Sequence, residues 1–368
     1  MDWNTARRIL CVRLDSLGDV LMTTPAIAAI KATHPNAHIT LMTSAAGAAL
    51  APQLPMVDEV WVYDAPWLKA TAPRPNSQPE YAIFDELRDR QFDAVIIFTV
   101  YSQSPLPAAF MAYMADIPLR LAHCRENPYQ MLTHYIREPE PEITRHEVQR
   151  QLDLVASVGY HTVDARLRLT VPPVSHDRIA ALLQSEGLDR RQPWVVVHPG
   201  ATASSRRYPP ELFAEVGRSL VQAGITVLFT GTVPERGLID DIRTQMGTPS
   251  LSLAGLLDLP DLSALLAATP LLLSNNTGPV HLAAALGTPV VDIYAPINNM
   301  QHTPWQVPHQ VLFHDVPCRL CYKSICPEGH HHCLRLLEPK EVVKATLNLL
   351  SANFPRLSGG VPQPVSVG

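Results

Sequence analysis

Short apolar runs alternate with helix-length segments along the sequence, and this alternation is the feature that most constrains the fold. Residues 9–14 (ILCVRL) form a strand-like run, and a turn then leads into residues 20–32, where apolar side chains recur at helical spacing. Further strand-like runs occupy residues 38–42, 60–63 and 94–98. Strands that alternate with helices are typical of βαβ units. We therefore expect a doubly wound parallel sheet.

The second half of the chain restarts the same pattern. A length of 368 residues favours two domains over one. We predict an N-terminal Rossmann-like domain over residues 1–172 and a C-terminal one over 173–355, with the linker within 165–178 and a disordered tail at 356–368. Strands are predicted at 194–198, 226–230, 250–253, 271–274 and 290–294, and helices at 209–223, 234–246, 260–268, 279–286 and 338–350. Open α/β sheets bind ligands at the carboxyl ends of their strands, so the two domains are expected to face a central cleft.

The composition narrows the class of protein. A formal charge of -5 argues against a nucleic-acid binder, which normally carries a basic excess. The N-terminus has no secretory pattern, and no apolar run is long enough to span a membrane. We therefore expect a cytoplasmic protein with at most peripheral contact with the inner face of the cytoplasmic membrane.

The turn after the first strand, Asp15-Ser16-Leu17-Gly18-Asp19, contains the first chemical candidate. Gly18 permits close approach of the backbone, and the carboxylate of Asp19 could act as a general base. The alternative is that Asp19 caps the following helix. A helix N-terminus also stabilises a carboxylate, which makes it a weaker base.

The loop between His198 and Pro209 combines small and hydroxyl-bearing residues with two arginines. Thr202 and Ser205 can donate hydrogen bonds, and Arg206 supplies a permanent planar charge that suits phosphate oxygens. The loop is a candidate diphosphate cradle, although it lacks the GxxxxGK[ST] pattern of ATPases. The alternative is a solvated loop with surface arginines.

A polar cluster joins a later strand to a helix of small residues, in the segment SNNTGPVHLAAALG. The free N–H groups near Thr277 and Gly278, together with the helix dipole, are expected to bind an anion. His281 is either a ligand contact or a structural histidine. Glu235 could accept hydrogen bonds from a ribose diol, or serve as an acid at a helix N-terminus.

Cysteines crowd near the C-terminus. Cys318, Cys321, Cys326 and Cys333 could hold a structural zinc ion. The alternative is four reduced thiols that pack the loop, because a second CxxC pair is missing. No catalytic role is expected in either case.

Taken in order, SLGDVLMTTPAIAAI, the HPGA…RRYP loop and SNNTGPVHLAAALGTPVV resemble glycosyltransferase family 9 from Arg8 to about Leu350. That family includes the heptosyltransferases of lipopolysaccharide inner-core assembly. The resemblance implies the two-domain architecture called GT-B, with acceptor bound by the N-terminal domain and donor by the C-terminal domain. It also implies inverting transfer of a sugar from a nucleotide-diphospho donor, with no metal or other cofactor required for catalysis.

The resemblance assigns residues to these roles. It makes Asp19 the catalytic base, puts Arg206 and Thr202 at the donor diphosphate and puts Glu235 at the donor ribose. The position of Asn276 is usually Asp in lipopolysaccharide heptosyltransferases, so ADP-heptose is favoured as donor while another sugar or nucleotide stays possible. Independently of the resemblance, Arg120 and Arg125 are candidates for contacting an anionic glycan or glycolipid acceptor; the alternative is that they are surface charges. The predicted donor-binding residues are Gly18, Thr202, Ser205, Arg206, Glu235, Asn276, Thr277, Gly278 and His281.

Two other functions fit a similar two-domain layout. One is a nucleotide-sugar epimerase, which would change the sugar without a second acceptor. The other is a nucleotide-sugar-binding protein without activity, although Asp19 and Arg206 argue against it.

Overall fold

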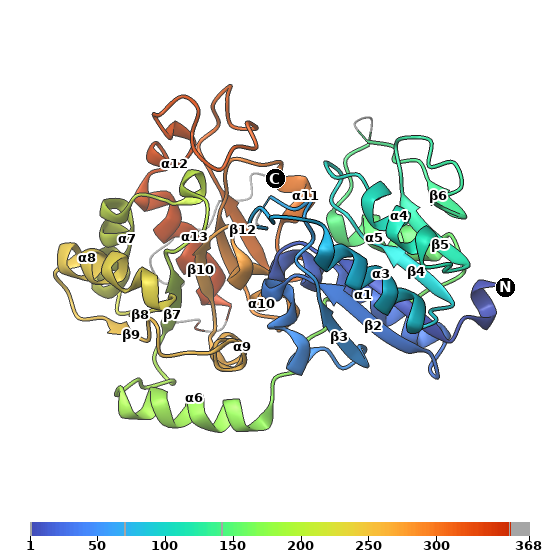
Figure 1. The fold of residues 1–368 in the computed structure, drawn as a ribbon. Coiled ribbons are helices and arrows are strands. Elements are labelled where there is room, and N and C mark those ends of the chain that lie inside the picture. The colour runs from blue at the N-terminus through green and yellow to red at the C-terminus, as the bar shows by residue number, and fades with distance from the viewer. Residues whose placement is uncertain (1, 70, 141–142, 353, 355–368) are drawn as a thin grey trace, which may run out of the picture. The chain divides into compact units, whose positions relative to one another are not determined.

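The computed structural model describes residues 2–69, 71–140, 143–352 and 354, so the predicted tail at 356–368 lies outside the described residues. The chain forms two compact units (Figure 1). The first is Met1–Thr170 with Met300–His302, and the second is Val171–Asn299 with Thr303–Gly368. The predicted division lay between residues 172 and 173. The observed division lies two residues earlier, and it also assigns the short segment Met300–His302 to the first unit.

The first unit contains a six-stranded parallel sheet in the order β3-β2-β1-β4-β5-β6. Its central strand β1 is buried along all but its first residue. Such continuous burial is typical of parallel sheets, whose two faces are both covered by helices. The strands are β1 (Arg8–Arg13), β2 (His38–Thr43), β3 (Glu59–Val62), β4 (Ala94–Ile97), β5 (Leu119–His123) and β6 (His134–Ile136).

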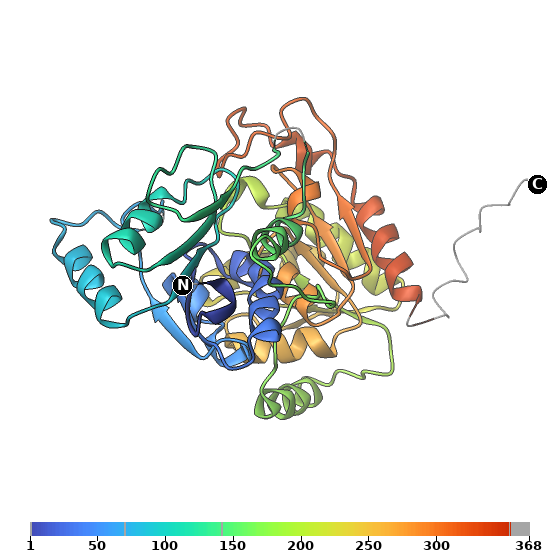
Figure 2. The same ribbon diagram turned by 90° about the vertical axis from the view of Figure 1, so that its right-hand side faces the viewer.

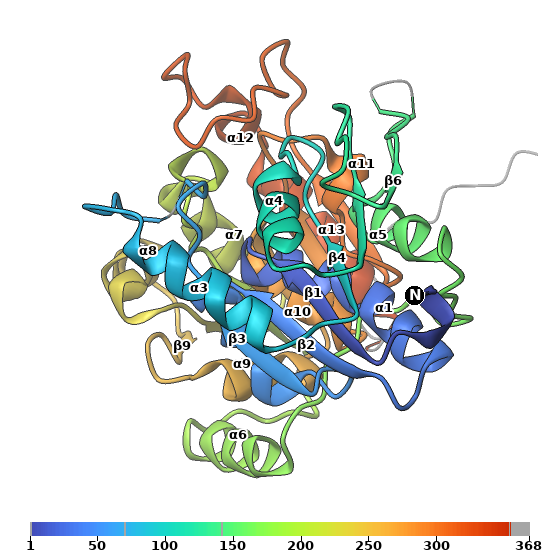
Figure 3. The ribbon, with the colours of Figure 1, turned by 45° about the vertical axis from the view of Figure 1, so that its right-hand side comes forward.

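Helices cover both faces of this first sheet. Helix α1 packs on α5, whereas α3 and α4 contact each other on the other face, as Figure 3 shows. Apolar residues of β1, β4, α3 and α4 form one core cluster there. The helical segments of this part are η1 (Trp3–Thr5), α1 (Leu17–Thr33), α2 (Ala45–Ala48), η2 (Ala51–Gln53), α3 (Gln78–Asp89), α4 (Leu106–Met114) and α5 (Glu147–Ala156).

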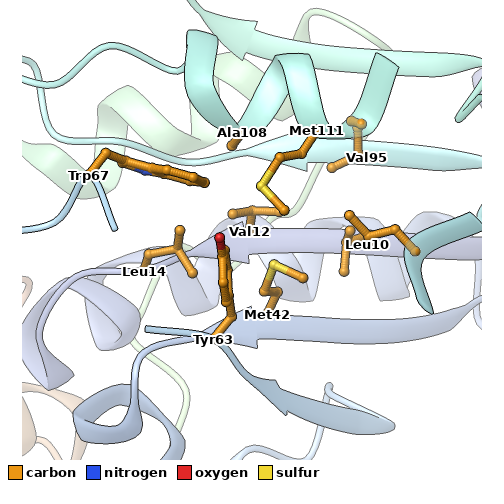
Figure 4. Close-up of a pocket in the computed structure, with 11 residues that line it drawn as sticks. Leu10, Val12, Leu14, Met42, Tyr63, Trp67, Val95, Ala108 and Met111 are labelled. Atoms are coloured by element: carbon orange, nitrogen blue, oxygen red, sulfur yellow. The ribbon is translucent and has the colours of Figure 1, made fainter. Parts of the chain in front are cut away.

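A small apolar cavity lies inside that cluster (Figure 4). Its volume is about 10 Å³, which is room for roughly one water molecule. Tyr63 directly follows β3, and its hydroxyl points into the cavity and has no hydrogen-bond partner among the described residues. This cavity is a gap in the core and is too small for a sugar nucleotide.

The second unit repeats the same topology, with the strand order β12-β11-β10-β7-β8-β9. All neighbouring strands are again parallel, and Ser274 of β10 lies beside His198 of β7. The strands are β7 (Trp194–His198), β8 (Thr226–Phe229), β9 (Leu251–Ser252), β10 (Leu272–Asn275), β11 (Val290–Ile293) and β12 (His309–Leu312). The prediction of two doubly wound parallel sheets is therefore confirmed.

Two layers of helices also cover the second sheet. Helices α7, α8 and α13 share one core cluster with its strands, and Figure 2 shows α13 in red beside the orange strands. Helix α9 contacts both α6 and α10. The helical segments here are α6 (Pro173–Ser185), η3 (Ser204–Arg206), α7 (Pro210–Gln222), η4 (Val233–Glu235), α8 (Arg236–Met246), α9 (Leu259–Ala268), α10 (Gly278–Ala285), α11 (Asn299–His302), α12 (His332–Arg335) and α13 (Pro339–Ser351).

The two units divide between Thr170 and Val171, inside the predicted linker over residues 165–178, and residues from Pro173 onward in that range belong to helix α6. Helix α6 begins at Pro173, so the Val171-Pro172-Pro173 signal marks the start of a helix. Proline is favoured in the first helical turn, where its missing N–H group would have had no partner.

Each sheet has one topological switch point, where the strand order reverses. It lies between β1 and β4 in the first unit and between β7 and β10 in the second. Ligands of doubly wound sheets bind beyond the carboxyl ends of the strands at this point. In the second unit the loops after β7 and β10 are those of the HPGA…RRYP and SNNTG motifs.

We predict that Leu273→Ala lowers the free energy of unfolding of the second unit by about 2–5 kcal/mol. Leu273 is fully buried in the core cluster of that unit, so truncation leaves a cavity. Urea unfolding followed by tryptophan fluorescence measures the change. Leu256→Ala is the control, because the half-exposed Leu256 should change stability by no more than about 0.5 kcal/mol.

Candidate functional site

A buried arginine organises the switch point of the first unit. Arg13, at the end of β1, is completely buried and forms three ion pairs. Its guanidinium lies 3.1 Å from Asp15, 3.1 Å from Asp19 and 3.0 Å from Glu147. A buried charge is tolerated only when it is paired, so these carboxylates and Arg13 depend on one another.

Asp19 sits in the first turn of α1 and is held at both carboxylate oxygens. Arg13 donates to Oδ1 at 3.1 Å, while the N–H and hydroxyl of Ser16 donate to Oδ2 at 3.1 and 2.7 Å. Ser16 and Asp19 together form a capping box. Asp19 therefore does cap the helix, as the alternative held, and its side chain is still 18% exposed and within reach of a ligand. Gly18 is buried in the same turn.

Opposing effects set the pKa of Asp19. Burial alone would raise it, but the charge of Arg13 and the hydrogen bonds from Ser16 outweigh burial and hold the pKa below its usual value. Asp15 differs, because burial raises its pKa more than Arg13 lowers it. Two neighbouring carboxyls thus have pKa values shifted in opposite directions. With its lowered pKa, Asp19 is ionised at neutral pH.

Glu147 connects this site to a second buried arginine. It lies at the start of α5 and accepts hydrogen bonds from Arg13 at 3.0 Å and from Gln151 at 2.6 Å. Arg150, one turn further along, lies 3.4 Å from Glu147 and also pairs with Glu138. This network fixes the position of α5 against the end of β1.

The two acceptor candidates have different environments. The guanidinium of Arg120 donates to the carbonyl groups of Ile117, Gln130 and Met131, so it holds together the loops around it. Arg125 is exposed and stacks at 4.8 Å on the ring of Tyr101. Only Arg125 presents a charge that an anionic acceptor could reach without displacing these bonds.

In the second unit, Asn275 joins the two motif loops at the switch point. Its amide donates to the carbonyl of Pro199 at 2.7 Å and accepts from the N–H of Tyr208 at 3.1 Å. It is fully buried at the end of β10. One side chain therefore fastens both ends of the loop that contains Thr202, Ser205 and Arg206.

Ser204 and Ser205 fasten the middle of this loop to the cysteine-rich segment. The hydroxyl of Ser205 donates to Lys323 O at 2.6 Å, and its N–H donates to Ser324 O at 3.2 Å. The hydroxyl of Ser204 donates to Ser324 O at 3.3 Å. Both hydrogen-bond donors of Ser205 are thus used within the protein. Thr202, by contrast, is exposed.

The two arginines of the loop have different roles. Arg207 donates to the carbonyls of Ala201 and Thr202 and so stabilises the loop itself. The guanidinium of Arg206 makes no hydrogen bond or ion pair with any described residue, although it is partly buried. A planar group of five N–H donors held without partners is suited to a phosphate. This matches the role predicted for Arg206.

Glu235 lies close to the start of the same loop. A Cβ atom at Gly200 would overlap the Glu235 carboxylate, so only glycine permits this approach. Oε2 of Glu235 accepts from the N–H and hydroxyl of Thr232 at 2.7 and 2.8 Å in a capping box. Glu235 therefore caps a helix N-terminus, as the alternative predicted, and its carboxylate also lies beside the candidate phosphate loop.

The start of α10 completes this group of residues. Thr277 is its N-cap and Gly278 its first residue, and no side chain caps the N–H groups there. His281 is buried in the same helix. Asn276 is also buried, and its amide donates at 3.0 Å to Asp292 on the neighbouring strand β11. An uncapped helix N-terminus offers N–H groups and a positive dipole end to an anion.

The four clustered cysteines are all unbridged thiols. Cys318 Sγ lies 3.8 Å from His330 Nε2, and burial together with the neighbouring thiols raises the pKa of Cys333. In the part of the chain that the structure describes, no three His, Cys, Asp or Glu side chains are arranged so that they could hold a metal ion. This geometry does not support the structural zinc site, which stays a prediction.

Among the helices of the described ranges, none combines the length and the apolar character needed to cross a membrane.

The family model of glycosyltransferase family 9 (heptosyltransferase) matches residues 81–332, which is most of the chain. The chain belongs to this family. It is therefore a glycosyltransferase, and the match gives the epimerase alternative no support. The predicted family and its two-sheet α/β fold are both confirmed.

Individual relatives agree with this assignment. Lipopolysaccharide heptosyltransferase 2 of Escherichia coli K12 is 24% identical over 358 residues, covering 93% of this chain and 98% of that protein. Lipooligosaccharide heptosyltransferase 2 of Campylobacter jejuni is 29% identical over 159 residues, and this match spans 42% of this chain and only half of that enzyme. The solved structure of E. coli ADP-heptose lipopolysaccharide heptosyltransferase II has a TM-score of 0.73 at 21% identity, covering 94% and 99% of the two chains.

Three residues of these sites were missed by reasoning from the sequence. Arg13 and Asp292 are charged residues inside apolar strand runs, and such a position is itself a signal, because charges are rarely buried without a partner. Glu147 lies in a polar helical segment, where nothing distinguishes it from its charged neighbours.

We predict that Arg13→Ala lowers the free energy of unfolding by about 3–5 kcal/mol, because it leaves buried carboxylates without their cation. The penalty should shrink as the pH falls and these carboxylates become protonated. Urea unfolding at several pH values measures both effects. Arg166→Ala is the control, since its exposed pair with Asp164 should contribute little. Equal losses in the two variants would contradict the central role of Arg13.

Proposed function

We propose that this protein is an inverting, metal-independent heptosyltransferase that uses ADP-heptose. Its acceptor would be a glycan or glycolipid of lipopolysaccharide or of another cell-surface polysaccharide. The observation that carries the proposal is the unpartnered guanidinium of Arg206, in a loop that Asn275 fastens to the end of β10 beside an uncapped helix N-terminus.

In this proposal the second unit binds the donor. Arg206, the hydroxyl of Thr202 and the N–H groups at the start of α10 hold the diphosphate. Glu235 accepts hydrogen bonds from the ribose. As the bond to the anomeric carbon breaks, these groups stabilise the negative charge that grows on the departing diphosphate. They would supply the stabilisation for which other transferases use a metal ion.

The first unit provides the base and the acceptor contacts. Asp19 accepts the proton of the acceptor hydroxyl as that oxygen attacks the anomeric carbon from the face opposite the diphosphate. Its lowered pKa means that Asp19 is ionised and ready to accept, but it is a weak base. Proton transfer would therefore occur late, when the attacking oxygen has become acidic. Arg125 is the better-placed contact for an anionic acceptor.

The relatives' names support the choice of substrates. One is a lipopolysaccharide heptosyltransferase and one a lipooligosaccharide heptosyltransferase, and the solved structure is that of an ADP-heptose lipopolysaccharide heptosyltransferase. We therefore propose a cytoplasmic enzyme that meets its lipid-linked acceptor at the inner face of the membrane.

A thermal-shift screen of nucleotide-sugars tests the donor. A ligand that binds only the native state raises the melting temperature by mass action. We expect ADP-heptose and ADP to raise it more than UDP-sugars or GDP-sugars do. A shift confined to a UDP- or GDP-sugar would reject ADP-heptose as the donor.

We predict that Asp19→Asn reduces kcat by about 10²–10⁴-fold, because the general base is lost while the shape of the side chain is kept. Donor binding, measured by calorimetry with ADP, should stay unchanged. In the parent enzyme the lowered pKa of Asp19 should leave kcat unchanged as the pH falls, until the pH reaches the titration range of Asp19 well below neutrality. Unchanged turnover in the variant would reject Asp19 as the base.

We predict that Arg206→Ala raises the dissociation constant for ADP about 10–100-fold, the worth of a charge-assisted hydrogen bond or two. Arg206→Lys should recover only part of this loss, because lysine keeps the charge but not the planar fork. Isothermal titration calorimetry measures both. The control is Arg191→Ala, which removes an exposed arginine from the same unit and should bind ADP normally. Normal ADP binding by Arg206→Ala would remove this residue from the donor site.

A further inference from the structure

A buried carboxyl group lies next to the donor motif, and the proposed mechanism does not use it. Asp292 lies on β11 and is completely buried. Its Oδ2 accepts the side-chain amide of Asn276 at 3.0 Å, while its Oδ1 has no hydrogen-bond partner among the described residues. The backbone N–H of Asn276 is fixed as well, because it donates to Ile293 O at 3.0 Å. Asn276 is thus held at both its backbone and its side chain.

Few charges compensate for burying Asp292. Burial raises its pKa to about 8, and the hydrogen bond from Asn276 and the charge of Arg206 offset only part of that effect. Tyr294 directly follows the end of β11, and burial together with the charge of Asp292 raises its pKa, an effect that Arg206 only partly offsets. At neutral pH Asp292 is therefore mainly a neutral acid.

The fold alone does not require this acid. The neighbouring residues of β11 are apolar and buried, and an apolar side chain of similar volume would avoid the cost of an unsatisfied carboxyl oxygen. A residue that is costly for stability and strongly perturbed in pKa indicates a functional site. Its one hydrogen-bond partner is Asn276, which lies directly before the helix N-terminus proposed to bind the donor.

We propose that Asp292 is a positioning residue of the donor site, which holds the amide nitrogen of Asn276 so that the carbonyl oxygen of Asn276 is left to accept a hydrogen bond from the donor. The group that it recognises is a hydroxyl or amino group of the nucleotide-sugar, because a carbonyl oxygen repels phosphate. Position 276 then acts as an acceptor, as an aspartate would, without adding a fixed negative charge beside the diphosphate. This inference rests on the proposed function of the second unit as the donor-binding unit.

Exchanging the two side chains tests this arrangement. Asn276→Asp puts two carboxyl groups at hydrogen-bonding distance, which cannot both ionise, and should raise the KM for donor at least about tenfold. Asp292→Asn lets either end of the Asn276 amide face the donor and should raise KM by about threefold to tenfold. The double variant, Asn276→Asp with Asp292→Asn, restores an acid–amide pair. Its KM should fall below that of Asn276→Asp alone but stay above that of the parent, because the aspartate at position 276 keeps a negative charge beside the diphosphate.

Two further measurements separate positioning from general stability. The parent's affinity for ADP should fall as the pH rises through about 8, because Asp292 becomes charged near the diphosphate, and Asp292→Asn should lose this dependence. Folding stability should depend on pH in the same direction. Because the pKa of Asp292 is raised in the folded state, the free energy of unfolding should fall as the pH rises towards 8, and Asp292→Asn should avoid this loss.

Asp261→Asn is a matched control. Asp261 is a buried acid of the same unit with a raised pKa and an unpartnered Oδ1, but its cation is Arg178. This control should change stability and leave donor KM and its pH dependence unchanged. If the parent binds ADP and neither variant at 276 or 292 differs from it, the inference is overturned and the proposed function stands. If the parent binds no ADP, the proposed ADP-sugar donor fails first.

Discussion

The buried guanidinium of Arg13 is the constraint on which the first unit depends. It ends the central strand, pairs with Asp15, Asp19 and Glu147, and so ties the turn after β1 to the start of α5. The same interaction lowers the pKa of the proposed base, Asp19, which gains a fixed orientation at the expense of basicity. Fold and chemistry therefore make opposite demands on this carboxylate, and a late proton transfer satisfies both.

In the second unit, neutral amide and hydroxyl groups hold the candidate phosphate loop in place. Asn275 fastens the candidate phosphate loop at both ends, and Ser204 and Ser205 fasten its middle to the segment between Cys321 and Cys326. These neutral hydrogen bonds occupy the carbonyl groups of Pro199, Lys323 and Ser324, and the guanidinium of Arg206 makes no hydrogen bond with any described residue. A loop fixed in this way needs little ordering when the donor binds, which favours affinity. The cysteine-rich segment thus has a structural connection to the proposed donor site.

Local patterns in the sequence predicted most of the fold. The strand Trp194–His198 and the helix ending at Met246 agree with the structure, because apolar period and turn residues determine such elements locally. The boundary between the units lies within the predicted linker, but the start of α6 at Pro173 was not predicted, since a proline at a helix start and an extended segment look alike in sequence. Asp19 and Glu235 both act as helix caps, which was the alternative predicted for each from the sequence. What could not be predicted was pairing across the sheet, such as Asn276 with Asp292, because those contacts join residues that are far apart in the chain.

We propose that this chain transfers heptose from an ADP-linked donor to a glycan or glycolipid. The most direct measurement is mass spectrometry of purified enzyme incubated with ADP-heptose and a heptose-bearing lipopolysaccharide core acceptor. We expect an acceptor heavier by one heptose, together with release of ADP. Conversion of the donor sugar without any change in the acceptor's mass, or transfer only from a UDP-sugar, would contradict it.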